Sequence, residues 1–212
     1  KISILIRSNI YDMLAKLVLV AVFVALAVGR SYPLYKQCDS KWGSEILGTS
    51  SNTICKAGCL MSSIAMALSG TGHTYNPSTL NTWLNGHGGY VSGDLFVWAS
   101  VNSLGIKYIG KVPNSNIASS LSAGHIVILN VHNGGYWVLS TAISGTKISV
   151  NDPGYSTTSY DLSEIVANNS GLYHVGNSNF YGMMIDELEI AFNVNGRRDK
   201  LKEADHGMIE TQ

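Results

Sequence analysis

Charge is what this 212-residue chain has least of. Charged residues make up 13% of it, lysine plus arginine equal aspartate plus glutamate at 14 each, and the formal net charge is zero. Because a nucleic-acid-binding protein carries a basic stripe and this chain has none, we expect no nucleic-acid partner. The low charge and the 45% apolar content also argue against long disorder and favour one domain with a sizeable core.

The sequence also lacks internal repeats and histidines spaced as they are in metal sites. Four of the six histidines, His73, His87, His125 and His174, are scattered through glycine-rich loops and predicted strands. None of them shows the paired spacing of a metal site, so we expect neither a metal nor another cofactor.

The apolar run near the N-terminus is too short to span a membrane comfortably. Residues 17–29 follow Lys16 and end in a small-x-small triplet, AVG. A hydrocarbon core of about 30 Å needs about 20 apolar residues, so this run predicts a secretory signal peptide at 13–29, with a membrane anchor as the alternative. We therefore expect a secreted or extracytoplasmic protein with no stable membrane span after signal removal. Residues 1–12 precede Met13 and are treated as a doubtful upstream segment.

Cysteine is scarce, and its number is odd. In an oxidising compartment Cys38 and Cys55 can pair and leave Cys59 free, whereas a Cys55–Cys59 pair would consume that thiol. The sequence leaves both pairings open. The N-glycosylation sequon Asn168-Asn169-Ser170 is compatible with secretion.

The segment KAGCLMSSIAMALSG, residues 56–70, is the most informative stretch of the chain. It places Cys59 after a glycine, at the first turn of a predicted helix of small residues. Backbone N–H groups at a helix N-terminus stabilise a thiolate and lower a cysteine pKa from about 8.5. This pattern is typical of a nucleophile, and the alternative is a small apolar residue in the core.

Periodicity and turn residues predict an α+β domain over residues 32–176. The first half reads as helices at 59–69, at 79–84 after an Asn-Pro-Ser start, and at 95–105 after a cap at Asp94. A strand at 106–112 and a short helix at 117–121 follow. The second half reads as strands at 125–132, 136–142 and 147–151, a short helix at 161–166 and a strand at 172–175. The expected architecture is a helical half packed on an antiparallel β meander.

The C-terminal residues differ in character from this domain. Residues 186–212 hold seven of the fourteen acidic residues, and RRDKLKEAD is the densest charge run in the chain. We therefore expect residues 177–212 to form a flexible charged tail.

A cysteine on the first helix of a helical half, followed by a β half, is the layout of papain-like enzymes. The chain resembles the bacteriocin-processing (family C thirty-nine-like) branch of that clan. The matching pieces, in the family's order, are YPLYKQCDSKWG at 32–43, TICKAGCLMSSIAMAL at 53–68, AGHIVILNV at 123–131, GGYWVLST at 134–141 and SVNDPG at 149–154.

The resemblance implies a role for each matching position. Cys59 corresponds to the nucleophile, and Gln37 to the glutamine whose amide donates to the developing oxyanion beside the Cys59 backbone N–H. Asp152 corresponds to the residue that orients the catalytic imidazole. Taken alone, Gln37 reads as a surface residue, and Asp152 as the cap of an Asn-Asp-Pro-Gly turn.

The family's histidine position is occupied by Tyr136. A phenol with a pKa near 10 is protonated at neutral pH and cannot act as the general base. His132 offers a replacement: a three-residue loop at 133–135 would place it opposite Tyr136 on one face of the sheet, with Cβ atoms about 5 Å apart. The alternative is a solvated hairpin histidine.

Two functions follow from these residues. The first is a secreted thiol hydrolase that cleaves peptide or amide bonds through an acyl-enzyme on Cys59. The second is a catalytically impaired papain-like module that binds a peptide or a cell-surface partner in the cleft that would hold substrate in an active enzyme. Cys59, Gln37 and Asp152 favour the enzyme, which we place slightly ahead, and Tyr136 favours the binding module.

Overall fold

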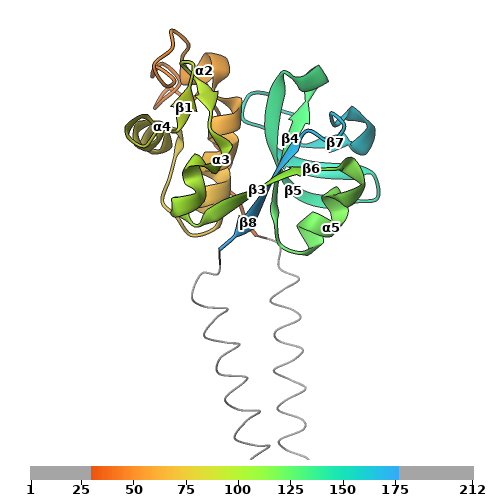
Figure 1. Cartoon of the computed structure of the whole chain (residues 1–212). Helices are drawn as coiled ribbons and strands as arrows, with labels where there is room; N and C mark the ends of the chain where they lie inside the picture. The colour runs from red at the N-terminus through yellow and green to blue at the C-terminus, as the bar shows by residue number, and fades with distance from the viewer. Residues whose placement is uncertain (1–29, 177–212) are drawn as a thin grey trace, which may run out of the picture.

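The computed structural model describes residues 30–176, which form a helical half packed against a half built on a β-sheet (Figure 1). The first half contains α2 (Ile54–Ala57), α3 (Cys59–Gly70), α4 (Pro77–Gly86), β1 (Tyr90–Val91), β2 (Leu95–Phe96) and the 3-10 helix η1 (Trp98–Leu104). The second contains β3 (Ile106–Val112), η2 (Asn114–Asn116), α5 (Ile117–Ser122), β4 (Ile126–Val131), η3 (His132–Gly134), β5 (Tyr136–Ser144), β6 (Lys147–Asn151), β7 (Ser159–Asp161), η4 (Leu162–Glu164) and β8 (Ser170–Val175). The expected α+β architecture is confirmed.

The predicted signal peptide at 13–29, the segment 1–12 and the charged tail at 177–212 lie outside the described residues. Within residues 30–176, no helix has both the length and the apolar character that crossing a membrane requires.

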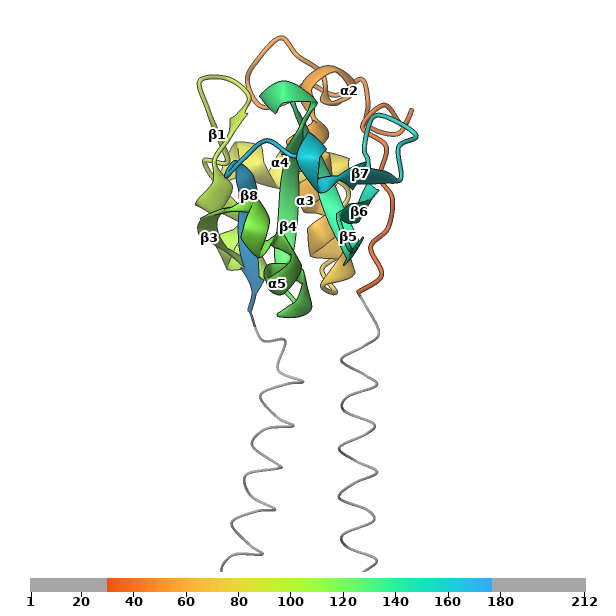
Figure 2. The ribbon, with the colours of Figure 1, turned by 90° about the vertical axis from the view of Figure 1, so that its right-hand side faces the viewer.

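The large sheet has six strands in the order β3-β8-β4-β5-β6-β7, and every neighbouring pair is antiparallel. Strands β4 to β6 follow one another as the predicted meander, and β7, which was not predicted, extends it. The last strand, β8, does not extend it but returns to lie between β3 and β4 (Figure 2). This return places the end of the domain inside the sheet, between its edge strand β3 and β4.

Helix α3 lies at the centre of the core. Nine of its twelve residues are buried, so it is apolar on all sides, as expected of a helix enclosed by other elements. It packs mainly on β5, with further contacts to β4 and α4. The alternation of side chains along β4 divides its residues between the two faces: Ile126 and Ile128 join the core on the helical side, and Val127 and Leu129 join Ile117 of α5 on the other.

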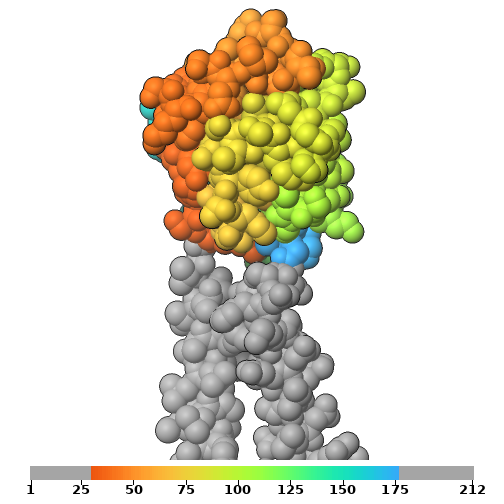
Figure 3. All heavy atoms as spheres, turned by 90° about the vertical axis from the view of Figure 1, so that its left-hand side faces the viewer, coloured from red at the N-terminus to blue at the C-terminus, as the bar shows by residue number. Residues whose placement is uncertain are grey.

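Local signals account for α4. The Asn76 side chain accepts a hydrogen bond from the Thr79 backbone N–H, the Thr79 hydroxyl receives the Asn76 backbone N–H, and Pro77 occupies the first turn. The predicted start of this helix is confirmed. Seen from the helical side, α4 lies on the molecular surface (Figure 3).

The predicted helix at 95–105 is wrong in its first turn. Leu95 and Phe96 pair instead with Tyr90 and Val91 in a two-stranded hairpin, and only Trp98–Leu104 coil, as a 3-10 helix. Asp94 does not cap a helix, because its carboxylate accepts a 2.7 Å hydrogen bond from the Asn52 side chain. The short helix predicted at 161–166 is a single 3-10 turn, η4.

Candidate active site

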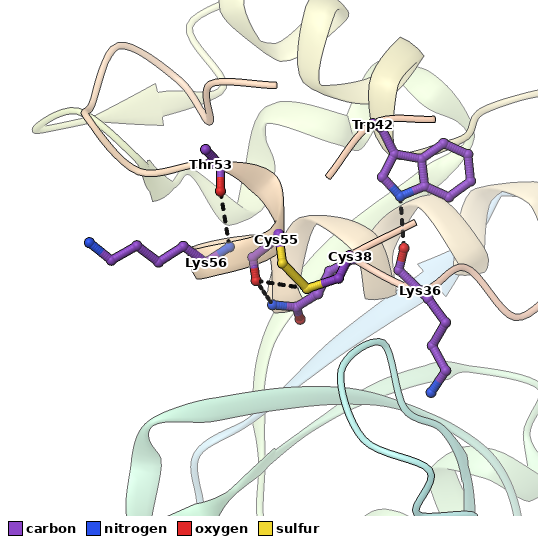
Figure 4. The surroundings of a disulfide bond; sticks show 7 residues. Lys36, Cys38, Trp42, Thr53, Cys55 and Lys56 are labelled. Carbon is purple, nitrogen blue, oxygen red and sulfur yellow. Dashed lines mark hydrogen bonds between the residues drawn. A yellow bond between two sulfur atoms is a disulfide. The ribbon is translucent and has the colours of Figure 1, made fainter. Parts of the chain in front are cut away.

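The disulfide joins Cys38 to Cys55 and leaves Cys59 free, which decides between the two pairings that the sequence left open (Figure 4). Cys55 belongs to α2, and Cys59 opens α3 after Gly58. A Cβ at position 58 would lie 2.5 Å from the carbonyl oxygen of Ile54, so the turn between the two helices requires glycine. The disulfide therefore holds the segment that carries Gln37 against the helix pair that presents Cys59.

A pocket of about 380 Å³ opens beside Cys59, and both halves of the domain contribute to it. Polar and apolar groups share its walls about equally, and the lining residues are Gln37, Leu47, Asn52, Lys56, Ala57, Cys59, Leu60, Met61, Tyr90, Asp94, Leu95, Phe96, Gly135, Tyr136 and Trp137. Cys59, Gln37 and Tyr136 thus share one cavity, although they are far apart in the sequence. The side chain of Leu95 is 60% exposed at this site, so apolar surface continues outside the cavity.

The Cys59 thiol is not an easily ionised group in this setting. Burial, with 8% of the residue exposed, raises the pKa of Cys59, while hydrogen bonds from the backbone of Trp137, Leu60 and Cys59 itself lower it, and the nearby Asp152 carboxylate raises it further. The net direction is upward. The expectation of a lowered pKa from the helix N-terminus is therefore wrong, because loss of solvation outweighs the backbone dipoles.

Gln37 is held at the pocket by both its backbone and its side chain. Its backbone N–H donates to the carbonyl of Pro153 at 2.8 Å, and its Nε2 donates to the carbonyl of Cys55 at 2.6 Å. With 6% of the residue exposed, Gln37 is not the surface residue that its type alone suggests. Its Oε1 has no hydrogen-bond partner within residues 30–176.

Asp152 meets the side chain of Tyr136 directly. The Tyr136 hydroxyl donates to Asp152 Oδ1 at 2.8 Å, and both residues are buried, with 9% and 1% exposed. The same oxygen accepts the backbone N–H groups of Gly154 at 2.9 Å and Tyr155 at 2.8 Å. Asp152 therefore caps its turn and also accepts a hydrogen bond from Tyr136.

Tyr160 is a part of this cluster that sequence reasoning missed. Its hydroxyl donates to Asp152 Oδ2 at 2.9 Å, so both carboxylate oxygens have donors from the chain. Burial, followed by the hydrogen bond to Asp152, raises the pKa of Tyr160 to about 12 and that of Tyr136 well above its ordinary value. Both phenols stay protonated at neutral pH. No sequence motif marks Tyr160, since only the pairing of β7 with β6 brings it to Asp152.

His132 lies outside the pocket lining, against the tyrosines. The expected three-residue loop is wrong, because Val131 and not His132 pairs with Tyr136, and the chain turns through His132–Gly134 with His132 in the left-handed region at φ 51°. The imidazole nevertheless stacks on the Tyr136 ring, with centroids 5.3 Å apart and planes at 20°. Its Nε2 lies 3.3 Å from the Tyr160 hydroxyl. It is therefore near the cluster but receives no orienting bond from Asp152.

Aromatic side chains and a lysine lie next to one another at one side of the pocket. Trp137 lines the pocket and packs edge-on against Trp98 at a centroid distance of 5.0 Å. Lys111 Nζ lies 4.1 Å from the Trp98 ring centroid and 4.6 Å from that of Trp137. Within residues 30–176, no three histidine, cysteine, aspartate or glutamate side chains gather as a metal site would require.

Comparison with known proteins finds remote likeness among solved structures only. No family model and no curated protein matches the chain. Among solved structures, the chain is similar to a double glycine motif protease from an AMS/PCAT transporter, solved in complex with the leader peptide, at 13% identity over 69% of this chain and 94% of that one, with a TM-score of 0.47. A likeness this remote carries no inference about activity, so the site is interpreted from its own geometry.

Proposed function

We propose that this chain is a non-catalytic module of papain-like peptidase architecture that binds a peptide segment in the pocket beside Cys59. The observation that supports this most is the hydrogen bond from Tyr136 to Asp152. In a cysteine peptidase, the side chain at this position takes the proton of the thiol. A buried phenol whose pKa is raised and whose proton is committed to Asp152 cannot do so.

The state of the thiol supports the same proposal. The thiolate is the attacking species, and burial raises the pKa of Cys59, so the neutral thiol is favoured at neutral pH. Because no base removes the proton of its thiol, Cys59 only lines the pocket as a small, uncharged side chain.

The pocket itself supports ligand binding. Its volume of about 380 Å³ lies within the usual range for small-ligand sites, roughly 300–1,000 Å³. Apolar side chains such as Leu47 and Phe96 offer buried contact area, while Asn52 and Asp94 offer polar groups already fixed by their mutual hydrogen bond. The resemblance of residues 32–154 to peptidase domains makes a peptide the ligand class we infer.

Slow thiol hydrolysis on Cys59 is the second candidate. Its support is that Cys59 is free of the disulfide and shares the pocket with Gln37, the residue at the family's oxyanion position. His132 would then have to act in place of the missing base. The two functions differ in one measurable respect, which is turnover that depends on Cys59.

The test combines binding and hydrolysis on the same peptides. Purified wild-type protein and the Cys59→Ala variant are incubated with a library of fluorescently labelled random octapeptides, and bound peptides are then followed for cleavage. We expect both proteins to retain the same peptides and neither to cleave them. Turnover by the wild type that disappears in Cys59→Ala would establish the hydrolase instead.

Two surface variants test whether the peptide binds at this pocket. Leu95→Glu puts a charge on the exposed apolar surface at the pocket and is expected to weaken peptide binding at least tenfold without unfolding the protein. Leu34 is 52% exposed and does not line the pocket, so Leu34→Glu is the matched control and should bind normally. Equal loss in both variants would contradict a peptide site at this pocket.

We also infer that the protein works in an oxidising, extracytoplasmic compartment. The Cys38–Cys55 disulfide supports this, because such bonds persist where thiols are not kept reduced. Detection of these two thiols in reduced form in cells would contradict the inference.

A further inference from the structure

The turn before β8 presents an asparagine side chain to solvent. The backbone N–H of Asn169 donates to the carbonyl of Val166 at 3.3 Å, which closes the turn, and Asn168 adopts the left-handed conformation at φ 55°. Asn168 is exposed. Within the described part of the chain, its side-chain amide has no hydrogen-bond partner, whereas its backbone does.

Neighbouring side chains fix the backbone of this turn from the inner side. Asn114 Oδ1 accepts the backbone N–H of Asn168 at 3.4 Å, and Asn114 Nδ2 donates to the carbonyl of Ile165 at 3.1 Å. Lys111 Nζ donates to the carbonyl of Asn169 at 3.1 Å. The turn is therefore anchored through its backbone, and the Asn168 amide is left free on the outside.

Ser170, two residues further on, carries a hydroxyl that the folded domain does not use. It is fully buried as the first residue of β8, and its Oγ has no hydrogen-bond partner within residues 30–176. Burying a hydroxyl without a partner costs free energy, so alanine would suit the fold at least as well. In the unfolded chain the same hydroxyl completes the acceptor triplet Asn-x-Ser.

The chain contains no second usable triplet of this kind. Asn76-Pro77-Ser78 has proline in the middle position, which excludes it as an acceptor, and Asn168-Asn169-Ser170 is the remaining match. The exposed Asn168 amide and the unused Ser170 hydroxyl are two independent features at the same triplet.

We propose that Asn168 is an N-glycosylation site. The amide Nδ2 forms a bond to the anomeric carbon of the first sugar of a lipid-linked oligosaccharide. The bond from that carbon to the lipid pyrophosphate breaks, the pyrophosphate leaves with the electron pair, and the amide nitrogen loses one proton. The Cys38–Cys55 disulfide fits the oxidising compartment in which this transfer occurs.

The glycosylation triplet shares no residue with the pocket beside Cys59. None of the residues that line that pocket belongs to the turn at 165–170. The site is therefore independent of the proposed peptide binding, and either can fail without the other.

The test uses the full chain expressed in cultured animal cells with its own N-terminus. The protein is purified, its intact mass is measured, and it is treated with peptide-N-glycosidase in heavy-oxygen water, which converts a glycosylated asparagine into labelled aspartate. We expect one oligosaccharide and the label on Asn168. A protein that carries the disulfide but no glycan overturns the proposal, and so does a chain that stays reduced and unmodified inside the cell.

Two variants remove the acceptor while keeping the fold. Ser170→Ala deletes the unused hydroxyl, and Asn168→Gly keeps a residue that tolerates φ 55°. Each should lose the glycan completely and keep the far-ultraviolet circular dichroism of the wild type after enzymatic deglycosylation. Ser156→Ala changes an exposed serine outside the triplet and should keep the glycan. A glycan that persists in Ser170→Ala or Asn168→Gly would also overturn the proposal.

Discussion

The hydroxyl of Tyr136 donates a 2.8 Å hydrogen bond to Oδ1 of Asp152, and both residues are buried. Tyr160 donates to the other carboxylate oxygen at 2.9 Å. The buried carboxylate thus receives its hydrogen bonds from tyrosines and from the backbone of its own turn. Each of the two tyrosines therefore supplies one hydrogen bond to a buried carboxylate.

Removal of the Tyr136 hydroxyl should destabilise the fold. Tyr136→Phe deletes one hydrogen bond to a charged group, and we expect a loss of about 1.5–3 kcal/mol in the free energy of unfolding, measured by urea denaturation. Tyr160→Phe should cost a similar amount. The control is Tyr35→Phe, which removes a neutral 3.1 Å bond to Ser69 and should cost about 0.5–1.5 kcal/mol. Equal small losses in all three would show that Asp152 does not depend on its tyrosines.

Introducing a histidine at position 136 should create activity. In Tyr136→His the imidazole would lie beside both Asp152 and the pocket that contains Cys59. General-base assistance is worth about 10²–10⁴ in rate, so we expect fluorogenic peptide cleavage to rise by that factor over the wild type. The double variant Tyr136→His with Cys59→Ala should show none of the gain. A folded Tyr136→His protein that binds peptides but cleaves them no faster would contradict the assigned geometry.

Alkylation of Cys59 should be slow at neutral pH. Burial raises the pKa of its thiol, so the thiolate fraction at pH 7 is smaller than in a free cysteine with a pKa of about 8.5. The iodoacetamide rate, followed by mass spectrometry, should lie below that of free cysteine at pH 7 and rise as the pH is raised. Labelling at pH 7 faster than free cysteine would contradict the raised pKa.

The same raised pKa makes stability depend on alkaline pH. The folded state holds the Cys59 thiol proton more tightly than the unfolded state does. The neutral thiol's contribution to the free energy of unfolding is therefore fully present below the unfolded pKa, about 8.5. That contribution is lost as the pH rises through the pKa of the folded state. Cys59→Ser removes this group. The difference in unfolding free energy between the wild type and Cys59→Ser should therefore shrink above pH 8.5, and a difference independent of pH would refute the linkage.

Loss of the disulfide should weaken both the fold and the pocket. The bond links residues 17 apart, and a loop of that size contributes about 3 kcal/mol by constraining the unfolded chain. The double variant Cys38→Ser with Cys55→Ser should lose about that much stability in urea. Peptide binding should fall too, since Gln37 precedes Cys38 and donates to the Cys55 carbonyl. Cys59→Ser keeps the disulfide and controls for the loss of a thiol.

Several elements could be predicted because their signals are local. The Asn76 cap and Pro77 mark the start of α4, and the alternating runs of β3 and β6 mark strands whose bounds match the expected ones. The turn at 88–97 could not be predicted in this way. There, the Asn52 side chain binds Asp94 from a distant loop and removes the expected helix cap.

The sequence by itself determined the α+β class, the position of Cys59 at the start of a helix and the turn chemistry around Asp152. All three depend on residues close together in the chain. The tertiary structure decided which cysteines pair, that β8 returns to lie between β3 and β4, and that Tyr136 meets Asp152. It also reversed the expected direction of the Cys59 pKa, because solvation is set by everything that packs around the sulfur, and the helix dipole is only one part of that environment.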